Sequence, residues 1–100
     1  MKNYWKAVNE VIRRSDVLIQ VLDARFPEET RNKEVELKVL TSGKRLIYVV
    51  NKSDLAGDKH FPKSYVVLSS RTRRGLRSLR ERIMIEAKHL DKSMVFVGVL

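Results

Sequence analysis

Four apolar, strand-like runs alternate with helix-period segments along this chain, and this alternation restricts the fold more than any other feature of the sequence. The runs are Val17–Leu22, Arg45–Val50, Tyr65–Leu68 and Met94–Leu100, and they consist mainly of β-branched and other apolar residues. Strands of this kind are typical of sheets that are covered on both faces. The sequence therefore predicts an α/β fold, a three-layer sandwich with a mainly parallel sheet of about four strands and helices on both faces.

Segments with an apolar repeat near 3.6 residues lie between these runs and predict the helices. The first covers Asn3–Arg14, the second covers about Asn32–Leu40, and the third, Gly75–Leu90, has the clearest amphipathic stripe. The stretch 56–64 has room for a short helix but shows no clear period. A chain of 100 residues can bury one core, so we expect a single domain over residues 1–100.

Composition excludes several classes of protein. No apolar run approaches the ~20 residues that cross a bilayer, and the N-terminal segment lacks the apolar stretch of a signal peptide. The chain has no cysteine and only two histidines, His60 and His89, so we expect neither disulfides nor a metal site. These features predict a cytoplasmic protein without a membrane partner.

The chain is strongly basic, with 21 Lys and Arg residues against 12 Asp and Glu residues and a formal net charge of +9. A small domain with this charge attracts polyanions, of which nucleic acid is the usual one. Eight basic and three acidic residues fall between positions 71 and 92. The alternative is an ordinary solvated helix face. The candidates for contact with RNA phosphates are Arg73, Arg74, Arg77, Arg80 and Lys88.

The sequence N-K-S-D stands at the carboxyl end of the second predicted strand. A carboxylate such as that of Asp54 can accept two parallel hydrogen bonds from N1 and N2 of guanine, and adenine lacks this pair of donors. The stem of Lys52 can lie along one face of a flat base while its ammonium stays hydrated. Asn51 can join neighbouring loops. The alternative is a loop in which Asn and Asp form ordinary side-chain turns.

This stretch resembles the guanine-specificity motif of the Ras-like P-loop GTPases. Ser69, Ser70 and Arg71 are similar to the second base-contacting loop of that family, commonly Ser-Ala-Lys, in which a backbone N–H meets the guanine O6. The following sequence, T-R-R-G-L-R-S-L, is similar to the start of the family's next helix. The resemblance implies a guanine-binding site formed by Asn51, Lys52 and Asp54 together with Ser69, Ser70 and Arg71.

The order of these motifs resembles the circularly permuted GTPases of the YlqF/YawG type. Those proteins carry D-A-R-x-P before the guanine motif, and Asp23, Ala24, Arg25 and Pro27 match it, with a role that stays unassigned. A strand end followed by a Pro-containing turn is the alternative interpretation of this segment. In that family a strand like Met94–Leu100 leads directly into the G-x-x-x-x-G-K-S phosphate loop. We therefore expect the guanine-recognition half of an incomplete permuted GTPase domain, truncated just before that loop.

The resemblance implies GTP binding and hydrolysis in ribosome assembly, with rRNA or a ribosomal particle as the partner. No G-x-x-x-x-G-K-[ST] is present in these residues, so we expect no catalytic residue, no hydrolysis by this chain and weak binding of GTP or GDP. Mg²⁺ is expected only in the full-length protein. The alternative function is a non-catalytic, basic α/β RNA-binding module.

A further expectation concerns the edge of the sheet. In the Ras-like strand order, Met94–Leu100 lies beside Val17–Leu22 and has no strand on its other side within these residues. An exposed apolar edge tends to pair with another copy, which predicts homodimerisation or aggregation.

Overall fold

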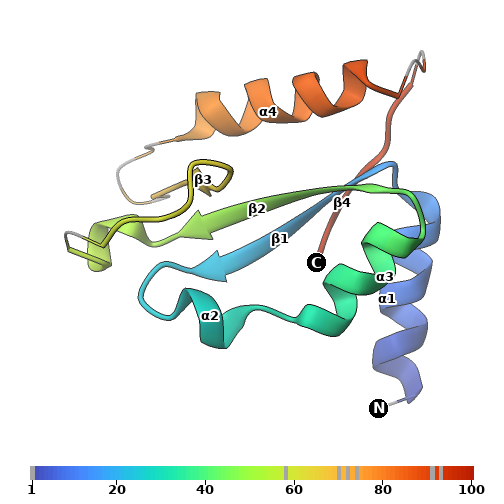
Figure 1. The fold of residues 1–100 in the computed structure, drawn as a ribbon, viewed down its shortest axis with the longest axis horizontal. Coiled ribbons are helices and arrows are strands. Elements are labelled where there is room, and N and C mark those ends of the chain that lie inside the picture. Colours follow the sequence, from blue (N-terminus) through green and yellow to red (C-terminus); the bar gives the residue numbers. More distant parts are fainter. Residues whose placement is uncertain are drawn as a thin grey trace.

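A computed structural model of the chain describes residues 2–57, 59–69, 71, 73, 75–90, 92 and 94–100. Figure 1 shows three layers, with α4 over one face of the sheet and α1 and α3 against the other. The elements, in chain order, are α1 (Lys2–Arg14), β1 (Val17–Asp23), α2 (Pro27–Thr30), α3 (Lys33–Thr41), β2 (Arg45–Asn51), a 3₁₀ turn η1 (Ser53–Leu55), β3 (Val66–Val67), α4 (Leu76–Lys88) and β4 (Val97–Val99).

The four strands form one parallel sheet in the order β3-β2-β1-β4. β1 and β2 pair over their whole length, from Val17 opposite Arg45 to Asp23 opposite Asn51, so the two strands end at the same level. β4 pairs with the first part of β1, as the strand order of the resembled family implies. The predicted α/β fold, with a parallel sheet covered by helices on both faces, is confirmed.

The core under α4 consists of alternate residues of three strands, among them Val17, Ile47 and Val66. Leu79 and Ile83 of α4 pack against these side chains, as the predicted stripe requires. Such burial of aliphatic side chains is the main stabilising contribution to a fold of this size. Leu76, another apolar residue of the segment predicted as this helix, lies in the first turn of α4 and is 52% exposed.

The core on the opposite face lies between β1, α1 and α3. Ile12, Leu18, Val35 and Val39 are buried there, and Trp5 and Val8 of α1 pack against them. The predicted apolar side of α1 is thus the side that faces the sheet.

Helix α3 begins after Asn32, whose side-chain oxygen accepts a hydrogen bond from the Val35 N–H. This is the usual way of capping the first turn of a helix. The apolar residues of this helix do not all face the core, since Leu37 and Leu40 are 63% and 58% exposed. The acidic Glu36 is buried instead.

Local predictions differ from the structure at several places. The fourth strand covers only Val97–Val99 of the predicted Met94–Leu100. The third strand is shorter than 65–68, because the Tyr65 N–H bonds back to the Pro62 carbonyl and the chain reaches β2 only at Val66. The stretch 56–64 contains no helix among its described residues, and a 3₁₀ turn precedes it. The four-residue α2 was not predicted. It begins at Pro27, a residue suited to the first turn of a helix.

Among the described residues, no helix is long and apolar enough to cross a membrane. Within the same part of the chain, no group of three or more His, Cys, Asp or Glu side chains is arranged to hold a metal ion.

Candidate functional site

Three loops meet at the carboxyl edge of the sheet, where ligands of parallel α/β sheets usually bind. The loop after β1 is joined to β2 by the Ala24 N–H, which donates to the Asn51 carbonyl at 2.8 Å. The loop after β2 is joined to β3 by the Ser53 N–H, which donates to the Leu68 carbonyl at 3.1 Å. The polar residues that follow the three strands therefore share one rim.

The backbone turns sharply where β2 ends. Lys52 adopts a left-handed conformation with φ 62°, which is uncommon for a residue with a side chain. The side-chain oxygen of Asn51 accepts a hydrogen bond from the Lys52 N–H at 2.8 Å and stabilises this turn. η1 follows directly and carries Asp54. The Asn51 side chain thus stabilises the turn of its own loop. The hydrogen bonds that join this loop to its neighbours are made by backbone groups instead.

Asp54 contacts the loop after β3. The Ser69 hydroxyl donates to Asp54 Oδ1 at 2.8 Å, and a guanidinium nitrogen of Arg71 lies 4.0 Å from Asp54 Oδ2. The Asp54 side chain is 21% exposed and the Arg71 side chain is 82% exposed, so solvent still reaches this carboxylate. The structure brings together Asp54, Ser69 and Arg71, whereas Ser70 lies outside the described residues. Their roles toward guanine stay predictions.

The D-A-R-x-P segment forms the neighbouring part of the rim. Asp23 accepts hydrogen bonds from the Arg25 guanidinium, at 2.9 and 3.1 Å, and from the Arg25 N–H at 2.9 Å. The Arg25 side chain, and then its N–H, holds the pKa of Asp23 far below its ordinary value. Ala24 is buried beneath the rim with Leu22, and Pro27 begins α2.

Lys52 connects the two motifs. Its ammonium lies 3.4 Å from Oδ2 of Asp23, and its side chain is 50% exposed. A pocket of about 230 Å³ opens at this place and is lined by Val21, Leu22, Asp23, Thr30, Asn51 and Lys52. This contact was not predicted from the sequence.

Two further residues of the rim were also missed. Thr30 accepts a hydrogen bond from the Asp23 N–H at 3.1 Å through its hydroxyl, and that hydroxyl donates to the Phe26 carbonyl. The Lys59 ammonium donates to the Arg25 carbonyl at 2.8 Å. Neither residue belongs to a recognisable motif, so the sequence carried no signal for them.

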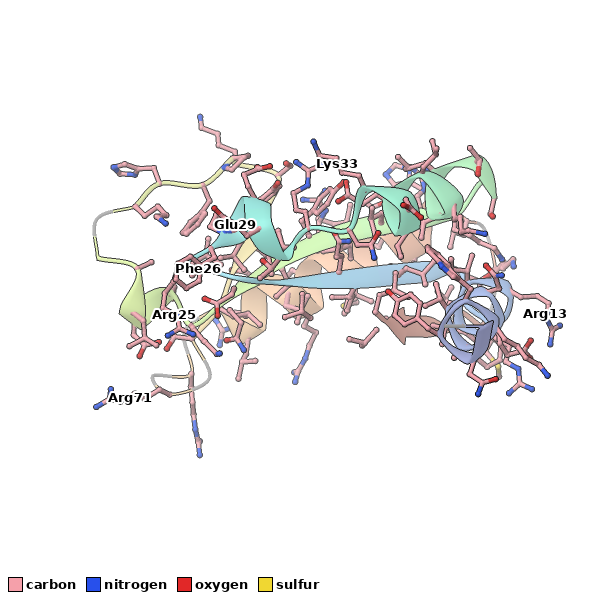
Figure 2. The ribbon with its side chains drawn as sticks, turned by 90° about the horizontal axis from the view of Figure 1, so that it is seen from below. Arg13, Arg25, Phe26, Glu29, Lys33 and Arg71 are labelled. Carbon is pink, nitrogen blue, oxygen red and sulfur yellow. The ribbon has the colours of Figure 1, made fainter. Side chains whose placement is uncertain are left out.

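The basic residues predicted to contact RNA lie elsewhere. Arg77, Arg80 and Lys88 are exposed on α4, and none of them forms an ion pair with another described residue. Arg73 precedes α4 in a left-handed conformation with φ 59°, and Arg74 lies outside the described residues. Figure 2 shows Arg25 and Arg71 at one end of the sheet and Arg13, on α1, at the other.

The rim thus offers a partly exposed carboxylate beside a hydroxyl, and a lysine stem that crosses from β2 toward β1. A carboxylate in such a place accepts hydrogen bonds from a planar N–H edge, and the stem offers an apolar face to a ring. A parallel α/β sheet with this motif at its carboxyl edge is the arrangement of a partial P-loop GTPase fold.

Comparison with known proteins identifies the relatives. The chain is 41% identical, over 95% of its length, to an uncharacterized GTP-binding protein of Methanocaldococcus jannaschii. About half of it, 54%, aligns with the GTPase grn1 of Schizosaccharomyces pombe at 54% identity and with the nuclear GTP-binding protein NUG1 of Saccharomyces cerevisiae at 56% identity. A scan against protein-family models found no match.

The homologues of this chain are therefore GTP-binding proteins of the circularly permuted type, and the family predicted from the sequence is confirmed. The chain spans about a quarter, 27%, of the length of the Methanocaldococcus relative. It spans 12% and 11% of the two yeast relatives.

Proposed function

We propose that this chain is the guanine-recognition part of a circularly permuted GTPase that acts in ribosome assembly. The observation that carries the proposal is the arrangement of Asp54, Lys52 and Ser69 on one rim, where the carboxylate is partly exposed and the Ser69 hydroxyl fixes one of its oxygens. The relatives support it, because each of the three is named as a GTP-binding protein or a GTPase.

In this proposal, Asp54 accepts hydrogen bonds from N1 and N2 of guanine, and the Lys52 stem lies along the base. Backbone N–H groups of the 69–71 loop meet the guanine O6. GTP and GDP bind weakly to these residues alone, because charged phosphates supply most of the affinity for a nucleotide and no phosphate-loop motif is present in them. In this proposal, hydrolysis and Mg²⁺ binding require the phosphate loop of a complete permuted GTPase domain.

The test is a titration of the chain with nucleotide, monitored by NMR. GTP is expected to shift the backbone amide signals of residues 51–55 and 68–71, and xanthosine triphosphate is expected to shift them much less. In the Asp54→Asn variant this preference should reverse, because xanthine presents an acceptor where guanine presents its amino group. Glu29→Gln, which removes an exposed carboxylate on α2, is the control and should leave the preference unchanged. Unchanged preference in Asp54→Asn would exclude the role assigned to Asp54.

A second candidate function is RNA binding through α4, and it is favoured by three cations of this helix that form no ion pair with another described residue. Arg77, Arg80 and Lys88 stand at spacings of three and eight residues, which places them on neighbouring parts of the exposed helix surface. Such fixed cations suit a phosphate backbone. In this proposal the partner is rRNA, alone or within a ribosomal particle, and it contacts α4 while the rim holds the nucleotide.

The test compares two triple variants with the same loss of charge. Replacing Arg77, Arg80 and Lys88 by Gln should weaken binding to a single-stranded RNA. The slope of log K, the association constant, against log salt concentration should become less steep by about 2. Replacing Lys6, Arg13 and Arg14 on α1 by Gln is the matched control and should change the slope much less. Equal effects of the two variants would show that only the net charge matters.

The cytoplasmic location stays a prediction, since one yeast relative is named as nuclear and another as nucleolar.

A further inference from the structure

The D-A-R segment and the N-K-S-D segment are joined by one ion pair, between the Asp23 carboxylate and the Lys52 ammonium. The pairing of β1 with β2 makes this contact possible, because Asp23 stands opposite Asn51 in the register. The Ala24 N–H, which donates to the Asn51 carbonyl, continues that pairing one residue further. The carboxylate is thereby placed directly beside the turn from which Lys52 starts.

The carboxylate itself is held firmly. Three donor groups of Arg25 bind its two oxygens, and the side chain of Asp23 is 17% exposed. The Arg25 loop is fixed in turn, because the Lys59 ammonium donates to the Arg25 carbonyl. A charged group that is oriented in this way can position a second side chain, as an outer-shell partner does in other binding sites.

Lys52 needs such a partner. Its backbone is fixed in the left-handed conformation, whereas its side chain has four rotatable bonds and is half exposed. A lysine without a partner loses most of its rotamer freedom when a ligand orders it, and this loss weakens binding. With the ammonium at Asp23 and the Cα at the end of β2, the stem is already laid across the rim.

We propose that Asp23, oriented by Arg25, is a positioning residue that holds the Lys52 stem in place for a guanine base. This inference rests on the proposed function and assigns a role to the D-A-R segment. Asp23 does not touch the base in this scheme, and base selection is left to Asp54. Asp23 therefore acts on the affinity for all guanine nucleotides and leaves the discrimination between guanine and xanthine unchanged.

The first test needs no nucleotide. The ¹⁵N signal of a lysine ammonium is visible by NMR when a partner slows its proton exchange, and it broadens away when the group is free in water. In the chain without nucleotide, the Lys52 signal should be protected relative to that of Lys6, an exposed lysine. Asp23→Asn should abolish this protection, and Arg25→Gln should reduce it. Equal protection of Lys52 in the parent chain and in both variants would overturn the proposal.

The matched control lies at the other end of the same strand. Asp16 also pairs with a lysine, since its carboxylate is 2.7 Å from the Lys92 ammonium. Asp16→Asn makes the same chemical change on β1's amino-terminal side and should leave both the Lys52 signal and GDP affinity unaltered. A loss in Asp16→Asn equal to that in Asp23→Asn would mean that both act through the stability of β1.

The second test is a double-mutant cycle read by GDP titration. Asp23→Asn should weaken GDP binding about fivefold, which corresponds to about 1 kcal/mol, the upper range for a partly exposed ion pair. In the Lys52→Met background, which keeps a stem but no ammonium, the same change should have almost no effect. Equal losses in both backgrounds would show that Asp23 does not act through Lys52. If the parent chain binds no GDP, the proposed guanine-binding function fails for these residues. The ammonium signal of Lys52 would still test whether Asp23 positions this lysine.

Discussion

At the scale of single residues, the buried Glu36 is the least expected feature of the fold. Its carboxylate accepts two hydrogen bonds from the Arg31 guanidinium, at 2.7 and 3.0 Å, and one from the Tyr48 hydroxyl at 2.6 Å. The Arg31 side chain is the main cause that lowers the pKa of Glu36, and burial together with Glu36 raises the pKa of Tyr48 to about 12. This group joins α3 and the segment before it to β2.

A Glu36→Gln substitution should therefore lower the free energy of unfolding by about 1.5–3 kcal/mol at pH 7, the range for hydrogen bonds to a charged group. Because the folded-state pKa of Glu36 lies below its ordinary 4.5, its contribution is complete above that pH and is lost as pH falls through the lower, folded-state pKa. Urea unfolding at pH 7 and at pH 3 measures this, with Glu29→Gln as the exposed control. A Glu36→Gln penalty that is the same at both pH values would contradict the prediction.

The residues that form much of the rim could be predicted from the sequence, whereas the side-chain contact between Lys52 and Asp23 could not. Asn51, Lys52, Asp54 and Ser69 follow strand-like runs, and the parallel arrangement alone places such residues on one edge. The ion pair between Lys52 and Asp23 joins two residues that are 29 positions apart in the sequence. It depends on strand register and on side-chain conformation, and no local sequence pattern encodes either of them. The burial of Glu36 could not be predicted either, since its partners lie outside α3, on the preceding segment and on β2.

At the scale of elements, the junction between β3 and α4 depends on one glycine. Gly75 precedes the first turn of α4 with φ 87°, and a Cβ at this position would overlap the Val67 carbonyl of β3. The close approach lets α4 begin directly above the sheet edge. The amphipathic pattern predicted this helix to within two residues at each end, but it gave no information on that contact.

Substituting Gly75→Ala should cost about 1–3 kcal/mol of stability, because the left-handed conformation is strained for Ala and the new methyl group meets backbone that cannot move away cheaply. Gly57→Ala is a suitable control, since Gly57 has φ 62° and open space around it. Thermal unfolding of the two variants should show the larger loss for Gly75→Ala. Equal losses would mean that the backbone conformation alone matters and that the approach to Val67 does not.

In the other elements, the success of the prediction depends on the length of the element. α1, β1 and β2 have long periodic or apolar segments and were predicted nearly to their ends. α2 and β3 have four and two residues, too few for any period to emerge. Pro27 begins α2, and the hydrogen bond from the Tyr65 N–H to the Pro62 carbonyl precedes the start of β3 at Val66.

At the scale of the whole molecule, β4 is an edge strand of the described sheet, and its side chains are open to solvent. Val97 and Val99 are 41% and 63% exposed, and the preceding Phe96 is 57% exposed. A parallel strand with free hydrogen-bonding groups and apolar side chains is a site for pairing with another chain. The expected homodimer stays a prediction.

Light scattering over a range of concentrations tests this expectation. The chain should self-associate as concentration rises, and Val99→Lys should shift the association to higher concentration because a charge on an edge strand opposes pairing. Leu37→Lys, at an equally exposed apolar residue of α3, is the control and should have little effect. A chain that stays monomeric at high concentration, or equal effects of both substitutions, would contradict the role of the β4 edge.

The pairing of β4 with β1 also has a consequence for the time course of folding. β1, β2 and β3 follow one another along the chain and are neighbours in the sheet, so their contacts can form as the polypeptide emerges during synthesis. β4 must close on β1 across most of the sequence, and the hydrogen bond from the Phe96 N–H to Asp16 spans 80 residues. Such distant closures slow folding. The strands whose carboxyl ends form the rim can therefore assemble first, and the closing of β4 is the step that we expect to set the rate.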